Sequence, residues 1–376
     1  MKNNKTILFE KLLSKKPQDL KMIVGFDGFI DEIIHAVDKR IDSETFTRIE
    51  TLDQLAKRIE KASGLSTNIE LFPTQKKIGG NGPIMCNALG KYHAQLTYIG
   101  ALGVPNIDAV FSEMSEYVKI YSVANAAHTD ALEFDDGKLM LGKMATLNEV
   151  TYRQLIKTVG KENFISLLSE TNLFATVNWS MLPHMTDIWR NILQDILPLT
   201  SSRIDKPIFF IDLADPEKRE SKEIIEALDL LKQFSSHFNV VLGLNKKEAY
   251  DIGNILELFD SSSLEHMQVS LEDLTTALYE YLSIYGVVIH PVDRSCTMIN
   301  NMYYEETGPY VKKPKLTTGA GDNFNAGFVL GLMLGLNPKE ALLTGMGTSG
   351  YYVRNAKSPD YKELIRFLDD WGNDLV

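Results

Sequence analysis

Short apolar runs alternate along the chain with longer segments in which apolar residues recur at helical spacing. Most short runs are apolar at consecutive positions, which is typical of strands that are covered on both faces. Such an alternation predicts an α/β fold, with a mostly parallel sheet between two helical layers. The expected strands are Met22–Phe26, Leu96–Ile99, Leu173–Val177, Pro207–Ile211, Val240–Leu244 and Gly286–Ile289, and the expected helices are Leu52–Ser63, Thr151–Thr171, Thr186–Leu197, Lys222–Phe234, Leu271–Tyr285, Asp322–Leu334 and Lys339–Arg354.

One segment departs from this alternation. Two runs of alternating residues, Ala131–Phe134 and Lys138–Met144, flank the sequence Asp-Asp-Gly. Asp-Gly between two such runs favours a tight hairpin, because glycine tolerates the positive φ that the turn demands. We therefore expect a small β-strand lid at about residues 128–146, inserted into a single domain that covers residues 1–376.

Composition narrows the class of protein. Of 376 residues, 44% are hydrophobic and 24% are charged, which suits a globular core and argues against disorder. The 39 basic and 50 acidic residues give a net charge of −11, so we expect a small-molecule partner and no nucleic acid. Cys86 and Cys296 cannot form a disulfide framework. With no apolar stretch long enough to span a membrane, these features predict a cytoplasmic protein without a membrane partner.

The sharpest local signal is Gly319-Ala320-Gly321-Asp322, which leads into an apolar helix. Unhindered backbone amides at a helix N-terminus form a cradle for a phosphate or another anion. A carboxylate directly after that cradle is suitably placed to take a proton from an attacking hydroxyl. On these residues alone, a plain helix start capped by Thr318 is an equally good interpretation. The chain contains no GxxxxGK[ST] motif.

In its motifs the sequence resembles the PfkB-type carbohydrate kinases, the ribokinase-like family. Thr317 through Gly327 match the second signature of that family, with Leu316 where a polar residue is usual. The stretch from Gly79-Gly80-Asn81 to Gly103 is similar to the first signature, and Asn245 to Glu248 is similar to the Asn-x-x-Glu motif. The resemblance implies a three-layer α/β/α ribokinase-like core and an ATP-dependent transfer of phosphate to a sugar hydroxyl.

The resemblance also assigns roles at the phosphate end of the site. Asp322 is expected to be the general base, and the amides of Gly319, Ala320 and Gly321 are expected to hold the transferred phosphoryl group. ATP is expected to lie against Thr317, Thr318 and Asn355, and a monovalent cation is a further expectation. Asn245 and Glu248 are expected to hold Mg²⁺ through water, although N-x-x-E is also the spacing of a helix capping box.

The acceptor is expected to meet Asp27, Asp31, Gly79, Gly80 and Asn81. A carboxylate just past a strand end can accept two hydrogen bonds from adjacent sugar hydroxyls, although either aspartate could instead belong to a turn. Ile84 stands where the family usually has asparagine. An isoleucine would leave a buried hydroxyl unpaired, so ribose and fructose are expected to be poor acceptors.

Two other functions stay open at this point. The first is a nucleoside kinase, because the same scaffold serves ribosides. The second is a catalytically weak relative that binds a sugar or a nucleotide. We also expect a homodimer joined through the lid, and we expect His93 and His290 to be surface or loop residues.

Overall fold

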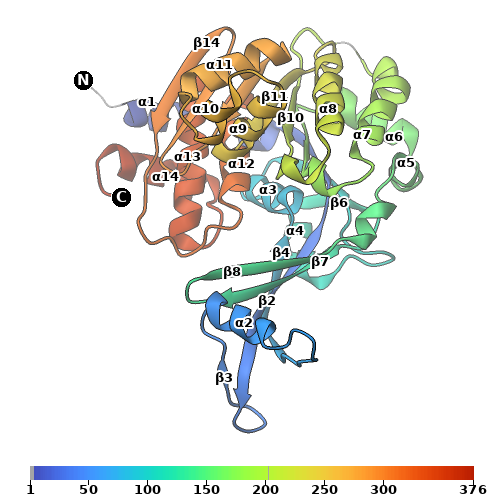
Figure 1. The fold of residues 1–376 in the computed structure, drawn as a ribbon. Coiled ribbons are helices and arrows are strands. Elements are labelled where there is room, and N and C mark those ends of the chain that lie inside the picture. The colour runs from blue at the N-terminus through green and yellow to red at the C-terminus, as the bar shows by residue number, and fades with distance from the viewer. Residues whose placement is uncertain (1–3, 202) are drawn as a thin grey trace.

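The computed structural model describes residues 4–201 and 203–376, which form one large central sheet and a smaller sheet that projects from it (Figure 1). Among these residues nine strands make up the central sheet, in the order β14-β13-β12-β11-β10-β9-β1-β5-β6. Their bounds are β1 Lys21–Phe26, β5 Gln95–Gly100, β6 Val118–Ser122, β9 Leu173–Val177, β10 Ile208–Asp212, β11 Asn239–Leu244, β12 Gly286–Ile289, β13 Arg294–Ile299 and β14 Met302–Thr307.

Helices cover both faces of the central sheet, because its strands send successive apolar side chains to opposite sides. In β10, for example, Phe209 joins one core cluster and Phe210 joins the other. The first face is covered by α5 Tyr152–Val159, α6 Lys161–Glu170, α7 Met185–Asn191, α8 Ser221–Phe234, α9 Lys246–Ile255, α10 Ser261–Glu265 and α11 Leu271–Leu282. The second face is covered by α1 Asn4–Leu12, α3 Asn81–Gly90, α4 Ser112–Ser115, α12 Ala320–Met333, α13 Pro338–Asn355 and α14 Tyr361–Gly372. The predicted three-layer α/β/α core is confirmed.

The strand order determines where chemistry can occur. β1 is the third strand from the β6 edge of the sheet and pairs in parallel with both β5 and β9. β9, β10 and β11 are also parallel neighbours, so their carboxyl ends meet at one edge of the sheet. In open α/β sheets, ligands bind in the crevice outside this edge.

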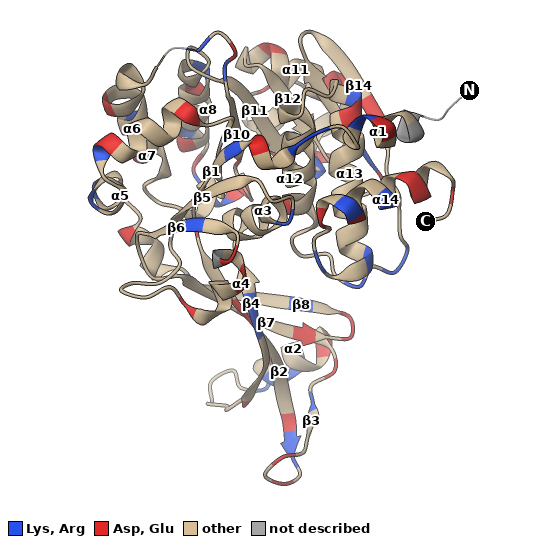
Figure 2. Cartoon of the chain, turned by 180° about the vertical axis from the view of Figure 1, so that it is seen from behind, with Lys and Arg blue, Asp and Glu red and all other residues tan. Residues whose placement is uncertain are grey.

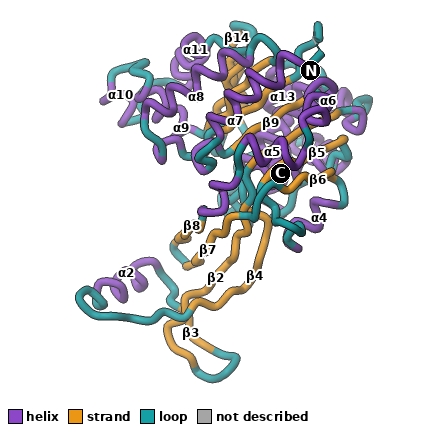
Figure 3. The backbone as a smooth tube through the Cα atoms, turned by 90° about the vertical axis from the view of Figure 1, so that its right-hand side faces the viewer, coloured by secondary structure: helices purple, strands orange, loops and turns teal. Residues whose placement is uncertain are grey.

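The lid is a second sheet, larger than the sequence predicted. It comprises β2 Phe29–Arg40, β3 Phe46–Arg48, β4 Leu71–Gly79, β7 Ala127–Phe134 and β8 Gly137–Lys143. Figure 3 shows these strands projecting away from the helical layers, with α2 Leu52–Glu60 beside them. α2 packs on one face of the lid, where Leu55 meets Ile34 and Leu132 in a small apolar core.

Two features explain why β2 and β4 were missed. A register shift between Ile33 and Ile34 breaks the period-2 pattern of β2, and β4 is mostly exposed and contains Pro73. The hairpin itself was predicted correctly, but for a partly wrong reason. Gly137 pairs with Phe134 as the first residue of β8, and a Cβ there would lie 2.9 Å from Leu52 of α2. This glycine therefore makes room for α2.

The predicted helices are present with small changes at their ends, except in two places. Thr151–Thr171 is two helices, because Gly160 between α5 and α6 has a φ of 83°. The segment predicted as Thr186–Leu197 is an α-helix only as far as Asn191 and then widens into a π-turn. No helix among the described residues has the length and apolar character needed to cross a membrane. In Figure 2, basic and acidic residues are interspersed over the elements seen from behind.

Candidate active site

Asp27 follows β1 directly and is completely buried. Its carboxylate accepts hydrogen bonds from the backbone amides of Asn81 (3.0 Å) and Gly82 (2.9 Å), which begin α3. The side-chain amide of Asn178, just after β9, donates another at 2.7 Å. Burial raises the pKa of Asp27 to about 6, although the hydrogen bonds oppose this rise. Asp27, predicted to meet the acceptor, thus fastens the N-terminus of α3 to the sheet edge.

Asn81 connects this anchor to Asp322. While its backbone amide donates to Asp27, its side-chain amide donates to Oδ1 of Asp322 at 2.9 Å. Asp322 lies in the first turn of α12 and is only 7% exposed. The structure therefore brings together two predicted groups that are 241 positions apart in the sequence.

Three other buried carboxylates lie near Asp322, namely those of Asp27, Asp212 and Glu248. We call these four groups the carboxylate cluster. Burial raises the pKa of Asp322 well above its ordinary value, and the neighbouring charge of Asp212 raises it further. Burial and Asp212 also raise the pKa of Glu248 to about 8. Within the described part of the chain, no lysine or arginine forms an ion pair with any of the four. The cluster therefore carries negative charge that a cation or a proton must compensate.

Asn245 and Glu248 form the capping box of α9. Oδ1 of Asn245 accepts from the Glu248 amide at 3.0 Å, and Oε2 of Glu248 accepts from the Asn245 amide at 2.8 Å. Oε1 of Glu248 also accepts from the backbone amide of Asp215, in the loop after β10, at 3.1 Å. The capping interpretation is therefore correct, and the same glutamate lies in the carboxylate cluster.

The predicted anion cradle is a turn with one residue in the left-handed region. Gly319 has a φ of 88° and directly precedes α12. The amide of Ala320 donates to the carbonyl of Thr317 at 3.0 Å, inside the turn. For the amides of Gly319 and Gly321 no acceptor is found in residues 4–201 and 203–376. Of the three amides of Gly319, Ala320 and Gly321, these two are left to bind an anion.

A cavity of about 360 Å³ opens beside this turn. Thr317, Ala320 and Gly321 line its polar end together with Asn245. Its other walls are largely apolar and include Pro309, Tyr310, Phe324, Met346 and Val353. A polar end beside free amides and an apolar remainder fit a nucleotide, with the phosphates at the turn and the base among the apolar side chains.

His290, expected to be a surface or loop residue, lies in the loop directly after β12 and forms part of this cavity's wall. Its ring packs against Phe324, with 4.8 Å between the ring centroids, and its Nε2 is buried with no hydrogen-bond partner among the described residues. Burial lowers the pKa of His290 to about 4, so the imidazole is neutral at pH 7. The loop position was predicted correctly, but the place in the cavity wall was not, because it depends on β12 ending beside the cavity.

On the lid side, Asp31 lies within β2 and not past a strand end. It is 5% exposed and pairs in register with Lys77 of β4. A Cβ on Gly79 would lie 2.3 Å from Oδ1 of Asp31, so a glycine is required there. Burial raises the pKa of Asp31, while Lys77 and the hydroxyl of Thr129 lower it.

A second and larger cavity, of about 950 Å³, lies between the lid, α3 and the start of α14. Ile33, Lys77, Ile84, Leu316 and Tyr352 contribute to its wall. Ile33 and Lys77 belong to the lid, and Leu316 leads into the anion turn. This cavity therefore extends from the lid, where the acceptor is expected, to the turn where the phosphate is expected.

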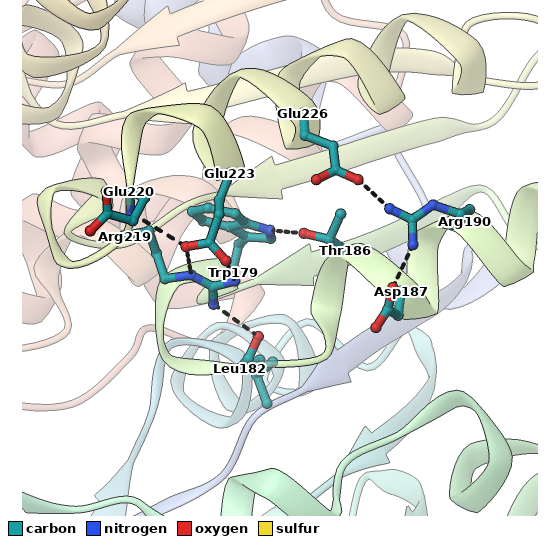
Figure 4. Close-up of polar contacts among 9 residues, drawn as sticks. All are labelled: Trp179, Leu182, Thr186, Asp187, Arg190, Arg219, Glu220, Glu223 and Glu226. Atoms are coloured by element: carbon teal, nitrogen blue, oxygen red, sulfur yellow. Dashed lines mark hydrogen bonds and ion pairs between the residues drawn. The ribbon is translucent and has the colours of Figure 1, made fainter.

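A brace away from the carboxylates fixes two of the loops at the sheet edge (Figure 4). The guanidinium of Arg219 lies over the ring of buried Trp179, 4.6 Å from its centroid, and donates to the carbonyl of Leu182 at 3.5 Å and to Glu223 at 3.2 Å. The indole N–H of Trp179 donates to Thr186 at 2.9 Å. The contact between Arg219 and Trp179 joins the loop after β10 to the loop after β9, which carries Asn178.

One predicted residue lies apart from the site, and two residues that bond the carboxylate cluster were not predicted. Asn355 is exposed, and its amide donates to the carbonyl of Tyr351 at the end of α13. Asn178 and Asn325 were not assigned, yet Nδ2 of Asn325 donates to Asp212 at 2.8 Å. For Asp212 and Asp215 the sequence left two alternatives open, a role near the nucleotide phosphates and a plain Asp-Pro turn. Asn178 and Asp212 stand at the carboxyl ends of apolar strands, and that position was the available signal.

A family model described as prokaryotic ketohexokinase matches residues 9–371 of the chain. The chain belongs to this family. The ketohexokinase of Haloferax volcanii is 26% identical over 354 residues, which cover 93% of this chain and 91% of that protein. This family member is therefore an ATP-dependent carbohydrate kinase, and the PfkB-type resemblance is confirmed.

Solved structures show the same fold. Arabidopsis thaliana ribokinase, complexed with ribose and ATP, has a TM-score of 0.61 at 15% identity, over 93% of this chain and 98% of that one. Adenosine kinase from Sinorhizobium meliloti has a TM-score of 0.62 at 14% identity, over 94% and 99%. A sugar kinase and a nucleoside kinase thus resemble this ketohexokinase-family chain equally well in fold.

Proposed function

We propose that this enzyme transfers the γ-phosphoryl group of ATP to a hydroxyl of a ketohexose, with Asp322 as the general base. The observation that carries the proposal is the position of Asp322. It is buried in the first turn of α12, next to the free amides of Gly319 and Gly321, and it is held by Asn81. The choice of a ketohexose rests on the family and on the Haloferax volcanii relative.

Proton transfer is the task of Asp322. Its raised pKa makes it a stronger base than an exposed aspartate. The hydrogen bond from Asn81 holds Oδ1, which leaves Oδ2 to accept the proton of the attacking hydroxyl. The negative charge that the phosphoryl group carries is met by the amides of Gly319 and Gly321 and by the N-terminus of α12.

Mg²⁺ is a hard cation that prefers oxygen ligands. Among residues 4–201 and 203–376 no three carboxylates, histidines or cysteines lie close enough to ligate an ion together, so the buried carboxylates would hold Mg²⁺ mainly through water. Burial raises the pKa of both Asp212 and Glu248, and the charge of Asp212 raises that of Glu248 further. Oδ1 of Asn325, whose side-chain amide bonds Asp212, is buried and has no hydrogen-bond partner among the described residues. Glu248, Asp212 and Asn245 would hold the ion in this way. When bound, Mg²⁺ supplies neutralising charge to the phosphates of ATP.

Glu248→Gln is expected to raise the Mg²⁺ concentration needed for half-maximal activity by about tenfold, with little change in Tm. Glutamine keeps one oxygen that can accept from the Asn245 amide, but it loses the acceptor for the Asp215 amide. It also removes a buried charge, so the two effects on Tm oppose each other, while the charge that attracts the cation is lost. Glu340→Gln is the matched control, because Glu340 occupies the same position in the capping box of α13 and is similarly buried. An unchanged Mg²⁺ requirement together with a large loss of Tm would leave Glu248 only its capping role.

The acceptor preference can be measured directly by ADP release. We expect kcat/KM for fructose or another ketohexose to exceed that for ribose, glucose and adenosine by about tenfold or more. The sequence had led us to expect fructose to be a poor acceptor, because Ile84 stands where the family usually has asparagine. The side chain of Ile84 lies against the anion turn, because a Cβ on Gly319 would be 3.1 Å from its Cγ2. That contact gives Ile84 a role independent of the acceptor. A clear preference for adenosine would instead support a nucleoside kinase.

The lid is proposed to close over the acceptor and exclude water, because β2 and β4 carry Asp31 and Gly79. Amide exchange in β7 and β8 should slow when fructose and a non-hydrolysable ATP analogue are added together. Protection confined to the α12 turn and β11 would contradict closure.

The lid is also proposed to join two chains into a homodimer, because the apolar side chains of Met140 and Leu141 in β8 are exposed.

A further inference from the structure

The hydroxyl of Tyr352 in α13 forms a hydrogen bond with the turn that precedes α12. It donates to the carbonyl oxygen of Thr318 at 2.8 Å. Tyr352 is 8% exposed and belongs to the wall of the larger cavity. This single bond ties the last turns of one helix to the anion turn of its neighbour, and α12 and α13 pack side by side (Figure 1).

The direction of this bond determines the direction of an amide. In a trans peptide the C=O and the following N–H point to opposite sides of the chain. Because the carbonyl of Thr318 points toward Tyr352, the N–H of Gly319 points away from it. That N–H is one of the two amides of the turn for which no acceptor is found within the described ranges.

Side chains crowd the turn on the Tyr352 side. A Cβ on Gly319 would lie 2.9 Å from the hydroxyl of Tyr352 and 3.1 Å from Cγ2 of Ile84. Tyr352 and Ile84 therefore occupy this side of the turn. The opposite side, toward which the Gly319 amide points, is left for an anion.

We propose that Tyr352 is a positioning residue for phosphoryl transfer, whose hydroxyl holds the Thr318–Gly319 peptide so that the Gly319 amide is aimed at the transferred group. The inference rests on the proposed anion cradle, and it assigns Tyr352 no contact with ATP or sugar. Burial and the nearby carboxylates of Asp322 and Asp31 raise the pKa of Tyr352, so its hydroxyl remains a donor at neutral pH.

Tyr352→Phe removes the hydroxyl and keeps the ring. We expect kcat to fall about tenfold, because one aligned donor to the transferred group is lost, while KM for the acceptor changes less than about twofold. Tm is expected to stay within about 2 °C of the parent protein. Tyr351→Phe is the matched control, because the neighbouring ring packs against Phe367 of α14 and away from the turn. That variant should keep the parent kcat.

Binding of ADP with aluminium fluoride, a mimic of the transferred phosphoryl group, gives a readout that does not depend on turnover. By calorimetry, Tyr352→Phe should weaken the fluoride-dependent complex about tenfold and leave the affinity for ADP alone unchanged. Equal weakening of both complexes would overturn the inference, as would unchanged kcat and unchanged fluoride binding. If the parent protein phosphorylates no sugar, the proposed function fails, whereas a selective fluoride effect in this variant still supports the role of Tyr352.

Discussion

Asp322→Asn is expected to lower kcat by about 10²-fold or more without loss of folded protein. Asparagine keeps the shape of the side chain but cannot take a proton from the attacking hydroxyl. The activity of the parent enzyme should fall on the acid side of neutrality, where the carboxylate cluster gains protons. The charges of these neighbouring carboxylates affect one another's pKa values. The fall of activity at acid pH therefore reports the titration of the cluster as a whole and not of a single residue.

The stability of this variant provides a second check. The pKa of Asp322 is raised in the folded protein, so the folded state binds the proton more tightly than the unfolded state. Its ionisation therefore costs stability as the pH rises above about 4, the ordinary value of an aspartate. Asp322→Asn should melt at the same or a higher temperature than the parent at pH 8, with a smaller gain at pH 5. Asp187→Asn, a surface change in α7, is the control for kcat. Parent-like turnover in Asp322→Asn would remove this residue from the mechanism.

Gly319→Ala is expected to reduce kcat by about 10²-fold or more and to cost about 1 kcal/mol of unfolding free energy. The φ of 88° is unfavourable for alanine, and its Cβ would meet Tyr352 and Ile84 at 2.9 and 3.1 Å. Relief of these contacts must shift the turn and misdirect its amides.

Gly335→Ala separates the cost of a positive φ from the misdirection of the amides. Gly335 lies just past the other end of the same helix and has a φ of 71°. Among the described residues, a Cβ there would meet Lys15 Nζ alone, at 4.0 Å. It should cost a similar free energy of unfolding, measured by denaturant titration, and leave kcat unchanged. Equal turnover of the two variants would show that the turn is not an anion cradle.

The central sheet could be predicted because burial on both faces leaves continuous apolar runs. β9, β10 and β11 are each buried at nearly every position. The order of the strands could not be predicted from these runs. It depends on packing between distant segments, such as the placement of β1 between β5 and β9.

The site was predictable where a local motif carries the chemistry and unpredictable where contacts are long-range. The turn before Asp322 and the Asn245–Glu248 pair have recognisable spacings, and both lie at the sheet edge. The hydrogen bond from Asn178 to Asp27 joins residues 151 positions apart and has no local signature. The anchoring role of Asp27 was missed for that reason.

The most direct test of the account is phosphorus-31 NMR of the full chain incubated with ATP, Mg²⁺ and fructose. The account predicts that a sugar phosphomonoester resonance and ADP grow in equal amounts, and that both are nearly abolished in Asp322→Asn. ADP that accumulates with inorganic phosphate and no sugar phosphate, for fructose and every other ketohexose tried, would contradict it.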